Sequence, residues 1–493
     1  MIESKSGENM NDREKEREEM WDVIEEAKTL WEVAFPTAVT GVIMYARSMV
    51  SMVFMGRLGE KELAAGSLAI AFANITGYSV LGGLSLGMEP LCSQALGAKR
   101  PKVLCMTLHR CVIFLICSSI PISVVWMNMS KMMVIVHKNK DINSMAQRYL
   151  VFLLPDLLTN SLLHPMRVYL RAQKVTNPQT LASLAGTILH IPLNLALLKH
   201  GLPGVAAASA ASSFAILTML MVYVWISGVQ KGTWTRPTRE CLRITGWEPL
   251  LKLAAPSCVS VCLEWWWYEI MILLCGMLLH PTSSLASMGI LIQTTSFIYV
   301  FPSSLALAVS TRVGHQLGAN SPRRARLSAL LSVFFAAILG FSALLFASSM
   351  RRFWATLFTS DPHILRLTSQ ALPILGLCEL GNCPQTVSCG VLRGTARPNV
   401  AANVNLAAFY LLGLPVAVAL AFCLHLGFCG LWLGLLSAQV SCAGLMLYTI
   451  GTTDWDYQAC RAQLLTTLDL SANGSDAHKQ PLIASLDNNT TPC

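Results

Sequence analysis

The sequence predicts an all-α polytopic membrane protein with twelve transmembrane helices in two six-helix lobes. Three observations lead to this prediction: an apolar composition, a series of long apolar runs, and an internal duplication. Of the 493 residues, 54% are hydrophobic and only 13% are charged, and the mean hydropathy is +0.52. Soluble globular chains carry about 25% charged residues. The composition therefore indicates a chain that resides in a membrane.

Apolar runs nearly free of charge recur along the whole chain, each about 20 residues long and so able to span a bilayer. Six fall in each half. They cover residues 33–56, 67–91, 104–129, 147–166, 180–198, 203–226, 250–276, 284–309, 326–349, 367–390, 400–423 and 428–450. Several contain Gly or Pro, which lipid tolerates only where neighbouring helices or a wet cavity satisfy the freed backbone groups.

The second half of the chain repeats motifs of the first half in the same order, about 220 residues later. The pairs are Ala34-Phe35-Pro36 with Ala254-Ala255-Pro256, Leu96-Gly97-Ala98 with Leu317-Gly318-Ala319, Leu170-Arg171 with Leu392-Arg393, and Gly201 and Gly204 with Gly427 and Gly430. We interpret these pairs as an internal duplication. In a membrane chain, duplication of a whole half is typical of secondary transporters.

The positive charges predict the orientation. With both termini in the cytoplasm, 25 of the 36 Lys and Arg residues lie on the cytoplasmic side, as the positive-inside rule requires. Since each half has an even number of spans, both halves enter the membrane in the same orientation, related by a pseudo-two-fold axis along the membrane normal. This bias accounts for the net charge of +9, and no nucleic-acid partner is expected.

The predicted organisation has five parts. They are a cytoplasmic arm with an amphipathic lead-in over 1–32, an N-lobe over 33–229, a cytoplasmic linker over 230–249, a C-lobe over 250–451 and a cytoplasmic tail over 452–493. The arm lacks the apolar region of a cleavable signal peptide. The tail is rich in Asp, Asn, Thr and Ser, and we expect it to be disordered.

Three acidic residues fall within predicted spans of the second half: Glu264, Glu269 and Glu379. A carboxylate at the centre of a span costs about 2.5–3.5 kcal/mol, so intramembrane acids mark functional sites by default. We expect at least one of the first two to share a cavity with Glu379, where burial favours the neutral form and lets the group load and release a proton. The alternative is a satisfied carboxyl that ties two helices together. Helix geometry separates Glu264 and Glu269 by roughly 140°, so both face one point only if the helix bends.

Five further residues are candidates for the wall of a solute cavity. Trp265 and Tyr268 could stack on planar or cationic solutes, or serve as packing residues and interface anchors. Gln293, Asn382 and Gln385 are polar groups within spans. The sequence shows no metal-ligand spacing of Cys or His, no Ser-His-Asp arrangement and no phosphate-binding loop. We therefore expect neither a cofactor nor enzymatic activity.

Several motifs resemble those of plant MATE (multidrug and toxic compound extrusion) transporters, the DETOXIFICATION family. Ser310-Thr311-Arg312-Val313-Gly314-His315-Gln316-Leu317-Gly318-Ala319 resembles the motif after helix 8, and Glu89-Pro90-Leu91-Cys92-Ser93-Gln94-Ala95-Leu96-Gly97-Ala98 its partner after helix 2. The resemblance implies a V-shaped cleft between two lobes and export of organic solutes in exchange for H⁺ or Na⁺. It also implies that acids of helices 7 and 10 couple transport to the ion, which here are Glu264, Glu269 and Glu379.

Two positions depart from the family pattern. The first span offers Tyr45, Arg47 and Ser48 but no acid, so ion coupling in the N-lobe is not expected. His315-Gln316 stands where the motif often has Asn-Glu, which removes a carboxylate at the cytoplasmic mouth.

The function predicted is a secondary active antiporter that exports a small organic solute of hormone, flavonoid, alkaloid or organic-acid type in exchange for protons, with Na⁺ less favoured. A monomer surrounded by membrane lipid is expected, in the plasma membrane or alternatively a vacuolar, endosomal or Golgi membrane. A lipid or oligosaccharide flippase, which would want a basic cavity, and a membrane sensor that signals through a regulatory protein partner remain alternatives.

Overall fold

The computed structural model describes residues 2–133, 140–234 and 246–471, and side chains within 20–467 of these ranges. The first half contains α1 (Ile2–Leu58), α2 (Glu60–Ala73), η1 (Asn74–Tyr78), α3 (Ser79–Leu86), α4 (Met88–Gly97), α5 (Pro101–Met127), α6 (Met129–Met133), α7 (Lys140–Ala172), α8 (Asn177–Leu197), η2 (Leu198–His200), α9 (Leu202–Ser227) and η3 (Val229–Gly232). The second contains α10 (Glu248–Cys275), α11 (Pro281–Gly318), α12 (Pro322–Met350), η6 (Trp354–Leu357), α13 (Pro362–Gly394), α14 (Pro398–Asn405), η7 (Leu406–Gly413), α15 (Leu414–Val418), η8 (Ala419–Cys423), α16 (Gly427–Gly451) and α17 (Trp455–Ser471).

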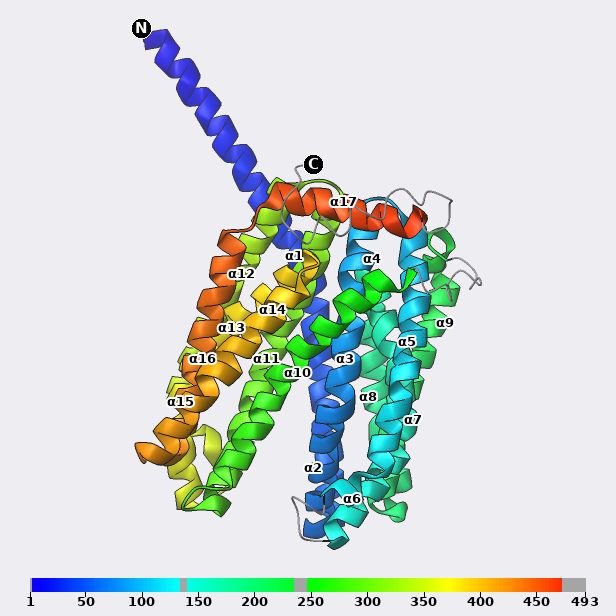
Figure 1. The fold of residues 1–493 in the computed structure, drawn as a ribbon, viewed down its shortest axis with the longest axis vertical. Helices are drawn as coiled ribbons and strands as arrows, with labels where there is room; N and C mark the ends of the chain where they lie inside the picture. The colour runs from blue at the N-terminus through cyan, green and yellow to red at the C-terminus, as the bar shows by residue number, and fades with distance from the viewer. Residues whose placement is uncertain (1, 134–139, 235–245, 472–493) are drawn as a thin grey trace.

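These elements form twelve rods of membrane-spanning length, six in each half. The second of these spans consists of α2, η1, α3 and α4 in continuous succession, and the eleventh consists of α14, η7, α15 and η8. Ten of the rods in the described residues are apolar enough to be recognised as spans by composition. The other two, α7 and α13, are equally long but more polar, and they occupy the same fourth position in their halves. The predicted all-α fold of two six-helix lobes is confirmed (Figure 1).

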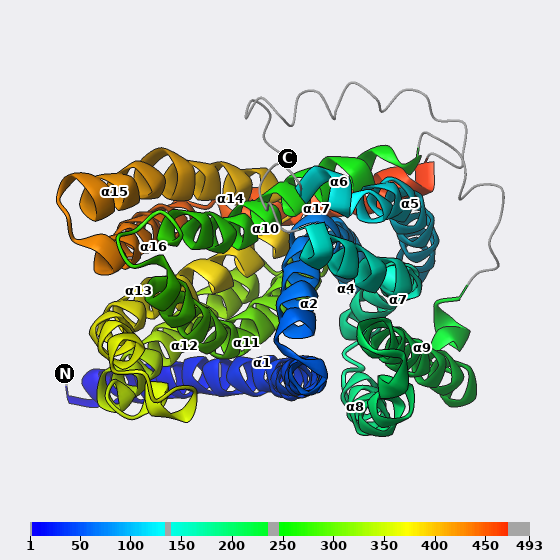
Figure 2. The same ribbon diagram turned by 90° about the horizontal axis from the view of Figure 1, so that it is seen from below.

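The first helix of each half also packs on the other lobe. Helix α10 lies along α3, and α1 lies along α11. Figure 2, viewed from the face opposite the termini, shows α1 passing α12 and α11 on its way to the N-lobe helices. Close approach of α10 to α3 depends on Gly83 and Gly87, where an added Cβ would stand 2.6 Å from the Cα of Cys258 and 2.3 Å from that of Ala254. The lobes are therefore joined along two pseudo-symmetric seams.

The duplicated Leu-Gly-Ala motifs meet each other at the face that carries the termini. A Cβ added to Gly97 would lie 2.2 Å from the carbonyl oxygen of His315, and a Cβ added to Gly318 would lie 2.1 Å from the carbonyl oxygen of Gln94. Each glycine thus abuts the residue three positions before the other glycine. This reciprocal contact is what a two-fold axis between the lobes requires, and only a residue without a side chain allows it.

The helices at this face end in the same turn four times. Lys99, Lys174, Asn320 and Ala396 all adopt left-handed backbone conformations, with φ of 56°, 59°, 55° and 56°. In each turn the following N–H bonds a carbonyl five residues back, for example Arg100 to Ala95 and Ser321 to Gln316, both at 2.8 Å. Such a left-handed cap closes a helix and satisfies its last carbonyls. The duplication therefore extends to backbone geometry.

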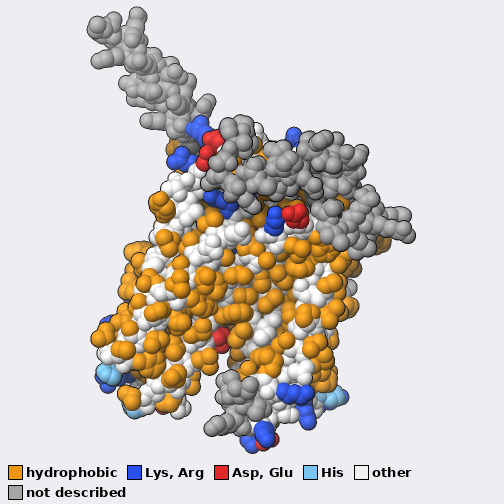
Figure 3. All heavy atoms as spheres, in the orientation of Figure 1, with side chains coloured by type: hydrophobic (Ala, Val, Ile, Leu, Met, Phe, Trp, Pro, Cys, Tyr) orange, Lys and Arg blue, Asp and Glu red, His pale blue; other side chains and the backbone are white. Residues whose placement is uncertain are grey.

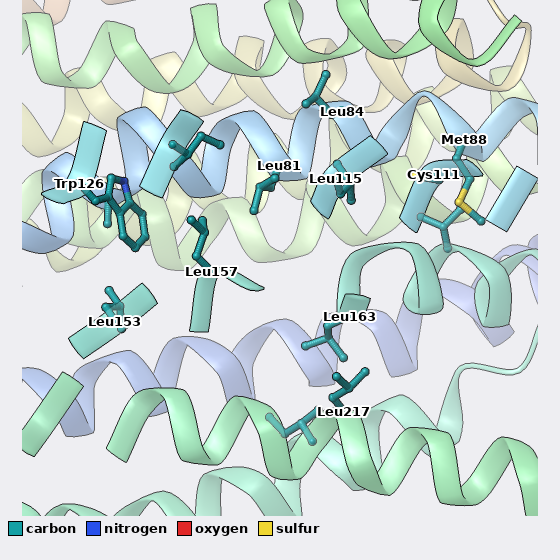
Figure 4. Packing of buried hydrophobic residues seen from close by; sticks show 14 of the residues in the cluster. Leu81, Leu84, Met88, Cys111, Leu115, Trp126, Leu153, Leu157, Leu163 and Leu217 are labelled. Atoms are coloured by element: carbon teal, nitrogen blue, oxygen red, sulfur yellow. The ribbon is translucent and has the colours of Figure 1, made fainter. Parts of the chain in front are cut away.

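At the opposite face the lobes part. The space-filling view shows a hollow between their lower ends, with an acidic side chain visible inside it (Figure 3). Each lobe keeps its own apolar core. In the N-lobe, Leu81, Leu115, Leu157 and the fully buried Trp126 come together from α3, α5 and α7 (Figure 4). In the C-lobe, Trp267 and Trp432 are the largest buried side chains of the core. A third cluster joins Leu30, Val33 and Ala34 of α1 to α11 and α12 of the C-lobe, so the apolar packing also crosses between the lobes.

The structure corrects two expectations for the ends of the chain. Helix α1 runs unbroken from Ile2 to Leu58, so the arm and the lead-in belong to the first spanning helix. Disorder over 452–493 is wrong for Trp455–Ser471, which forms α17. Trp455, Ala459 and Ala462 give this helix an apolar stripe at helical spacing, and all three are buried against α11 and α12. Residues 472–493 of the predicted tail and residues 235–245 of the predicted linker lie outside the described residues.

Candidate transport site

A cavity of about 320 Å³ lies between the lobes. Its wall is formed by residues of η1, α10 and α11: Asn74, Ile75, Glu264, Trp265, Tyr268, Glu269, Ile292, Thr295, Ser296 and Tyr299. The first two belong to the N-lobe and the rest to the C-lobe. Four of the wall residues were predicted site residues, namely the two glutamates and the two aromatic residues of α10.

Both glutamates of α10 line this one cavity. Their helical separation of roughly 140° does not prevent this, because the cavity curves around α10 and Tyr268 and Trp265 fill the arc between them. Both acids can line one cavity in this way without facing a single point, so the limit that helix geometry sets on a straight helix still holds. Glu264 is the more enclosed of the two, with 9% of its surface exposed.

The three tryptophans of α10 have three different environments. Trp265 lines the cavity. The Nε1 of Trp266 donates to the carbonyl oxygen of Ile75 across the lobe boundary, at 3.2 Å. Trp267 is fully buried and packs on Phe409 and Tyr410 in the C-lobe core. Of the three, Trp265 is the one on the cavity wall.

Glu379 lies directly behind the cavity wall. The hydroxyl of Thr295 donates to its Oε1, and Asn382 Nδ2 donates to its Oε2 at 2.9 Å. Gln439 Nε2 supports Asn382 by donating to its Oδ1 at 3.3 Å. The carboxyl is almost completely buried, with 1% exposed. Since Thr295 itself lines the cavity, a single hydroxyl separates Glu379 from the space that Glu264 faces.

Gln385 belongs to the same region but not to the wall. It and Tyr299 lie close enough to Glu264 to influence its carboxyl, and the Nε2 of Gln385 reaches Asn405 Oδ1 at 3.5 Å. Asn405 in turn donates to Ser260 Oγ at 3.0 Å. This chain ties α10, α13 and α14 together beside Glu264. Gln385 and Asn382 therefore act on the acids from behind the cavity surface.

Gln293 does not join the site. Its Oε1 and its backbone carbonyl accept from the hydroxyl of Tyr45 in α1, at 3.2 and 3.3 Å. The side chain thus faces the seam between α11 and α1. Gln293 therefore faces α1 and is not among the residues that line the cavity. The packing of α1 against α11 decides which side of α11 faces the cavity.

Thr295, Ser296, Tyr299 and Asn74 line the cavity without having been predicted. The sequence contains a pattern that could have indicated three of them, Thr295, Ser296 and Tyr299. Gln293-Thr294-Thr295-Ser296 is a run of four polar residues inside an apolar span, and Tyr299 lies one turn beyond Thr295. A polar run at mid-membrane depth requires partners, here a carboxyl and a cavity. Within the described residues no cluster of three or more His, Cys, Asp or Glu side chains could hold a metal ion.

The sequence model of the MatE family matches residues 36–196 and 256–419, one match in each lobe. The chain belongs to the MATE transporter family. Members of this family are transporters and not enzymes, and they need no cofactor.

Relatives of this MATE protein cover nearly the whole chain. Protein DETOXIFICATION 51 of Arabidopsis thaliana is 61% identical over 457 residues, which span 92% of this chain and 86% of the relative. Protein DETOXIFICATION 52 of the same organism is 59% identical over 444 residues, spanning 90% and 87%.

Solved structures of MATE transporters have the same fold. The eukaryotic MATE transporter AtDTX14 superimposes with a TM-score of 0.86 at 28% identity, covering 90% of this chain and all of that chain. The Vibrio cholerae MATE transporter VcmN in the bent form gives a TM-score of 0.77 at 16% identity, covering 90% and 99%. The second likeness concerns the fold alone.

Proposed function

We propose that this MATE protein is a secondary active antiporter that exports organic solutes in exchange for protons by alternating access. The observation that carries the proposal is the cavity between the lobes, with the carboxyls of Glu264 and Glu269 on its wall and that of Glu379 one hydroxyl behind it. Acids at this depth are costly and mark functional groups.

Proton binding at Glu379 changes a contact between two helices. The ionised carboxyl accepts from Thr295 of α11 and from Asn382 of its own helix α13. A protonated carboxyl is itself a donor and accepts less well. The hydrogen bond between Thr295 of α11 and Glu379 of α13 therefore differs between the ionised and the protonated carboxyl. Loading a proton from one side and releasing it to the other thus favours different packings of the C-lobe helices.

The hydrogen bonds of Glu379 favour a proton over Na⁺ as the coupling ion. Both of its oxygens already accept from donors, a hydroxyl and an amide. A metal cation needs several oxygen ligands grouped around it, whereas a proton needs one carboxyl oxygen and exchanges with the hydrogen-bonded arrangement at little structural cost. The driving energy for each proton is about 2.3 kcal/mol per 100 mV of membrane potential, plus the contribution of the pH gradient.

The aromatic wall of the cavity suits a flat organic solute. Trp265, Tyr268 and Tyr299 present rings from two helices, and such rings stack on planar groups and attract cations over their faces. With both termini in the cytoplasm, the hollow between the lobes opens to the extracytoplasmic side (Figure 3). The state described is then outward-facing, in a monomer that we place in the plasma membrane.

Transport by purified protein in sealed lipid vesicles tests the proposal. An imposed pH gradient should drive uptake of a solute from a panel of plant hormones, flavonoids, alkaloids and organic acids. Glu379→Gln and Glu264→Gln should each reduce the gradient-dependent rate about tenfold or more, since each removes a proton-binding group from the buried site.

Glu248→Gln is the matched control. Glu248 lies on the same helix as Glu264, but it is exposed and pairs with Lys252 at 2.9 Å, so transport should be unchanged. If both cavity variants transport like the wild type, the assigned proton site is wrong, and the antiport itself is not overturned. If no solute moves under any gradient, a membrane sensor becomes the better explanation.

A further inference from the structure

The interior of the N-lobe is charged in the opposite sense to that of the C-lobe. The C-lobe cavity has acidic residues on and behind its wall, whereas α1 and α7 carry Arg47 and Arg167 into the N-lobe. Among the described residues, no carboxylate oxygen lies within 4.0 Å of either guanidinium. A cation inside a membrane protein is costly unless a counter-charge accompanies it. The proton site in the C-lobe does not explain why Arg47 and Arg167 lie inside the N-lobe without a bound carboxylate.

Two other arginines of this protein show how such a side chain takes a carboxylate. Arg171 directs Nε and Nη2 at Oε1 of Glu89, at 3.2 and 2.9 Å. Arg312 directs the same two nitrogens at the two oxygens of Glu26, at 2.6 and 2.7 Å. These nitrogens form one edge of the guanidinium, whose two parallel N–H groups match the two oxygens of a carboxylate.

In Arg167 the same edge has no partner. Its Nε and Nη2 are both buried and form no hydrogen bond within the described part of the chain. The residue as a whole is only partly buried. An unpartnered buried donor costs its desolvation energy, and here two such donors stand side by side in the geometry that binds a carboxylate elsewhere in the molecule.

The buried carboxylates of α4 and α7 bond partners other than Arg167, although Oδ1 of Asp156 has no hydrogen-bond partner among the described residues. Glu89 is bound by Arg171, four residues beyond Arg167 on α7. Asp156 lies eleven residues before Arg167 on the same helix, about 16 Å along its axis. Its Oδ2 accepts from Tyr78 and from Asn160, the latter at 2.9 Å. Neither carboxylate reaches the free edge of Arg167.

Arg47 adds a second positive charge to the same region. Its Nη1 donates to Ser212 at 3.3 Å and to Ser213 at 2.9 Å, which are neutral acceptors. His190 fixes the position of Ser212 through a contact of 3.1 Å. The fields of Arg47 and Arg171 both reach Arg167, and the carboxylate of Asp156 opposes them there as a single negative charge. The N-lobe interior is thus positive and built on a fixed polar network, which stabilises an anion.

We propose that Arg167, assisted by Arg47, binds the carboxylate of the transported solute. The substrate class is then organic acids, with the carboxylate held on the N-lobe by the guanidinium edge that has no partner among the described residues. This inference rests on the proposed transport function for its physiological meaning, but the binding event can be measured without transport.

Equilibrium binding to the full-length protein in detergent tests the proposal, with benzoate and phenylacetate as probes and benzamide and phenylacetamide as their neutral counterparts. The wild type should bind the acids and bind the amides roughly tenfold or more weakly, because the amide lacks the charge that the guanidinium edge pairs with. Arg167→Gln should weaken binding of the acids to the level of the amides. Arg167→Lys should also weaken it, since it keeps the charge but loses the paired donors.

Arg57→Gln is the matched control, because Arg57 lies on the surface at the end of α1 and should leave binding unchanged. Folding of each variant is checked by its melting temperature, and Arg167→Lys keeps the test decisive if Arg167→Gln does not fold. Equal binding of acids and amides by the wild type, or undiminished binding by a folded Arg167 variant, overturns the subsite. Failure of proton-driven uptake alone would count against the antiport and leave the binding result intact.

Discussion

Thr295 is the residue on which the site's chemistry depends, because it belongs both to the cavity wall and to the coordination of a buried acid. Its hydroxyl donates to Glu379, and its side chain lines the space that Glu264 faces. Among the described residues, the other hydrogen-bond donor to Glu379 is Asn382, at 2.9 Å. A change at Thr295 therefore acts on the proposed coupling acid without removing a carboxyl.

Thr295→Val keeps the shape of the side chain but removes the donor. A hydrogen bond to a charged group contributes about 1.5–3 kcal/mol, so we expect gradient-driven uptake in vesicles to fall roughly tenfold or more. Thr295→Ser restores the hydroxyl and should recover most of the rate. Wild-type rates in the valine variant would show that Glu379 does not depend on this hydroxyl.

At the scale of elements, the lobes meet where backbone touches backbone. Gly97 and Gly318 allow the ends of α4 and α11 to approach each other until only a glycine fits. The left-handed turns that follow, at Lys99 and Asn320, then direct the chain into α5 and α12. At the face that carries the termini, the contact between the lobes therefore depends on the backbone geometry of these turns as well as on side-chain packing.

Gly97→Ala should destabilise the protein, because its Cβ would stand 2.2 Å from the carbonyl oxygen of His315 and backbone cannot easily move away. Overpacking of this kind costs about 1–3 kcal/mol, which a melting curve in detergent would detect as a lower melting temperature. Gly82→Ala is the control: nothing lies within 4 Å of its added Cβ, and alanine favours a helix. Equal melting temperatures for the two variants would contradict the tight contact.

At the scale of the whole molecule, the carboxylate of Glu89 joins the two lobes at their closed face. Glu89 of α4 binds Arg171 of the N-lobe at 2.9 Å and approaches Arg393 of the C-lobe at 3.6 Å. The two arginines are partners in the internal duplication, but the position equivalent to Glu89 in the second half is Ser310. The pseudo-symmetric pair of cations thus shares a single acid at the closed face. Removing its charge would leave them repelling each other.

Glu89→Gln should favour opening at the face that carries the termini, because breaking a buried ion pair costs about 3–5 kcal/mol. Cys92 is one turn away and fully buried, so it reports on this opening. With Cys92 as the remaining cysteine, its labelling by an impermeant maleimide from the terminus side should rise severalfold in the variant. Glu89→Asp serves as the charge-conserving comparison. Unchanged labelling would exclude the ion pair as a latch.

The sequence by itself determined the membrane class, the number of spans, the duplication and the acids at membrane depth. These properties follow from local hydropathy and from repeated motifs, which the bilayer constrains segment by segment. It also indicated the polar run around Thr295, although not its purpose.

Only the tertiary structure decided which side of each helix faces a neighbour, the cavity or lipid. It placed Gln293 against Tyr45, set Glu379 behind Thr295, ordered α17 against the lobes, and left the edge of Arg167 without a partner. The physical reason is that a polar side chain in a membrane must find a partner, and the candidates lie on helices distant in sequence. Which partner is within reach depends on how the twelve helices pack, and local sequence does not contain that information.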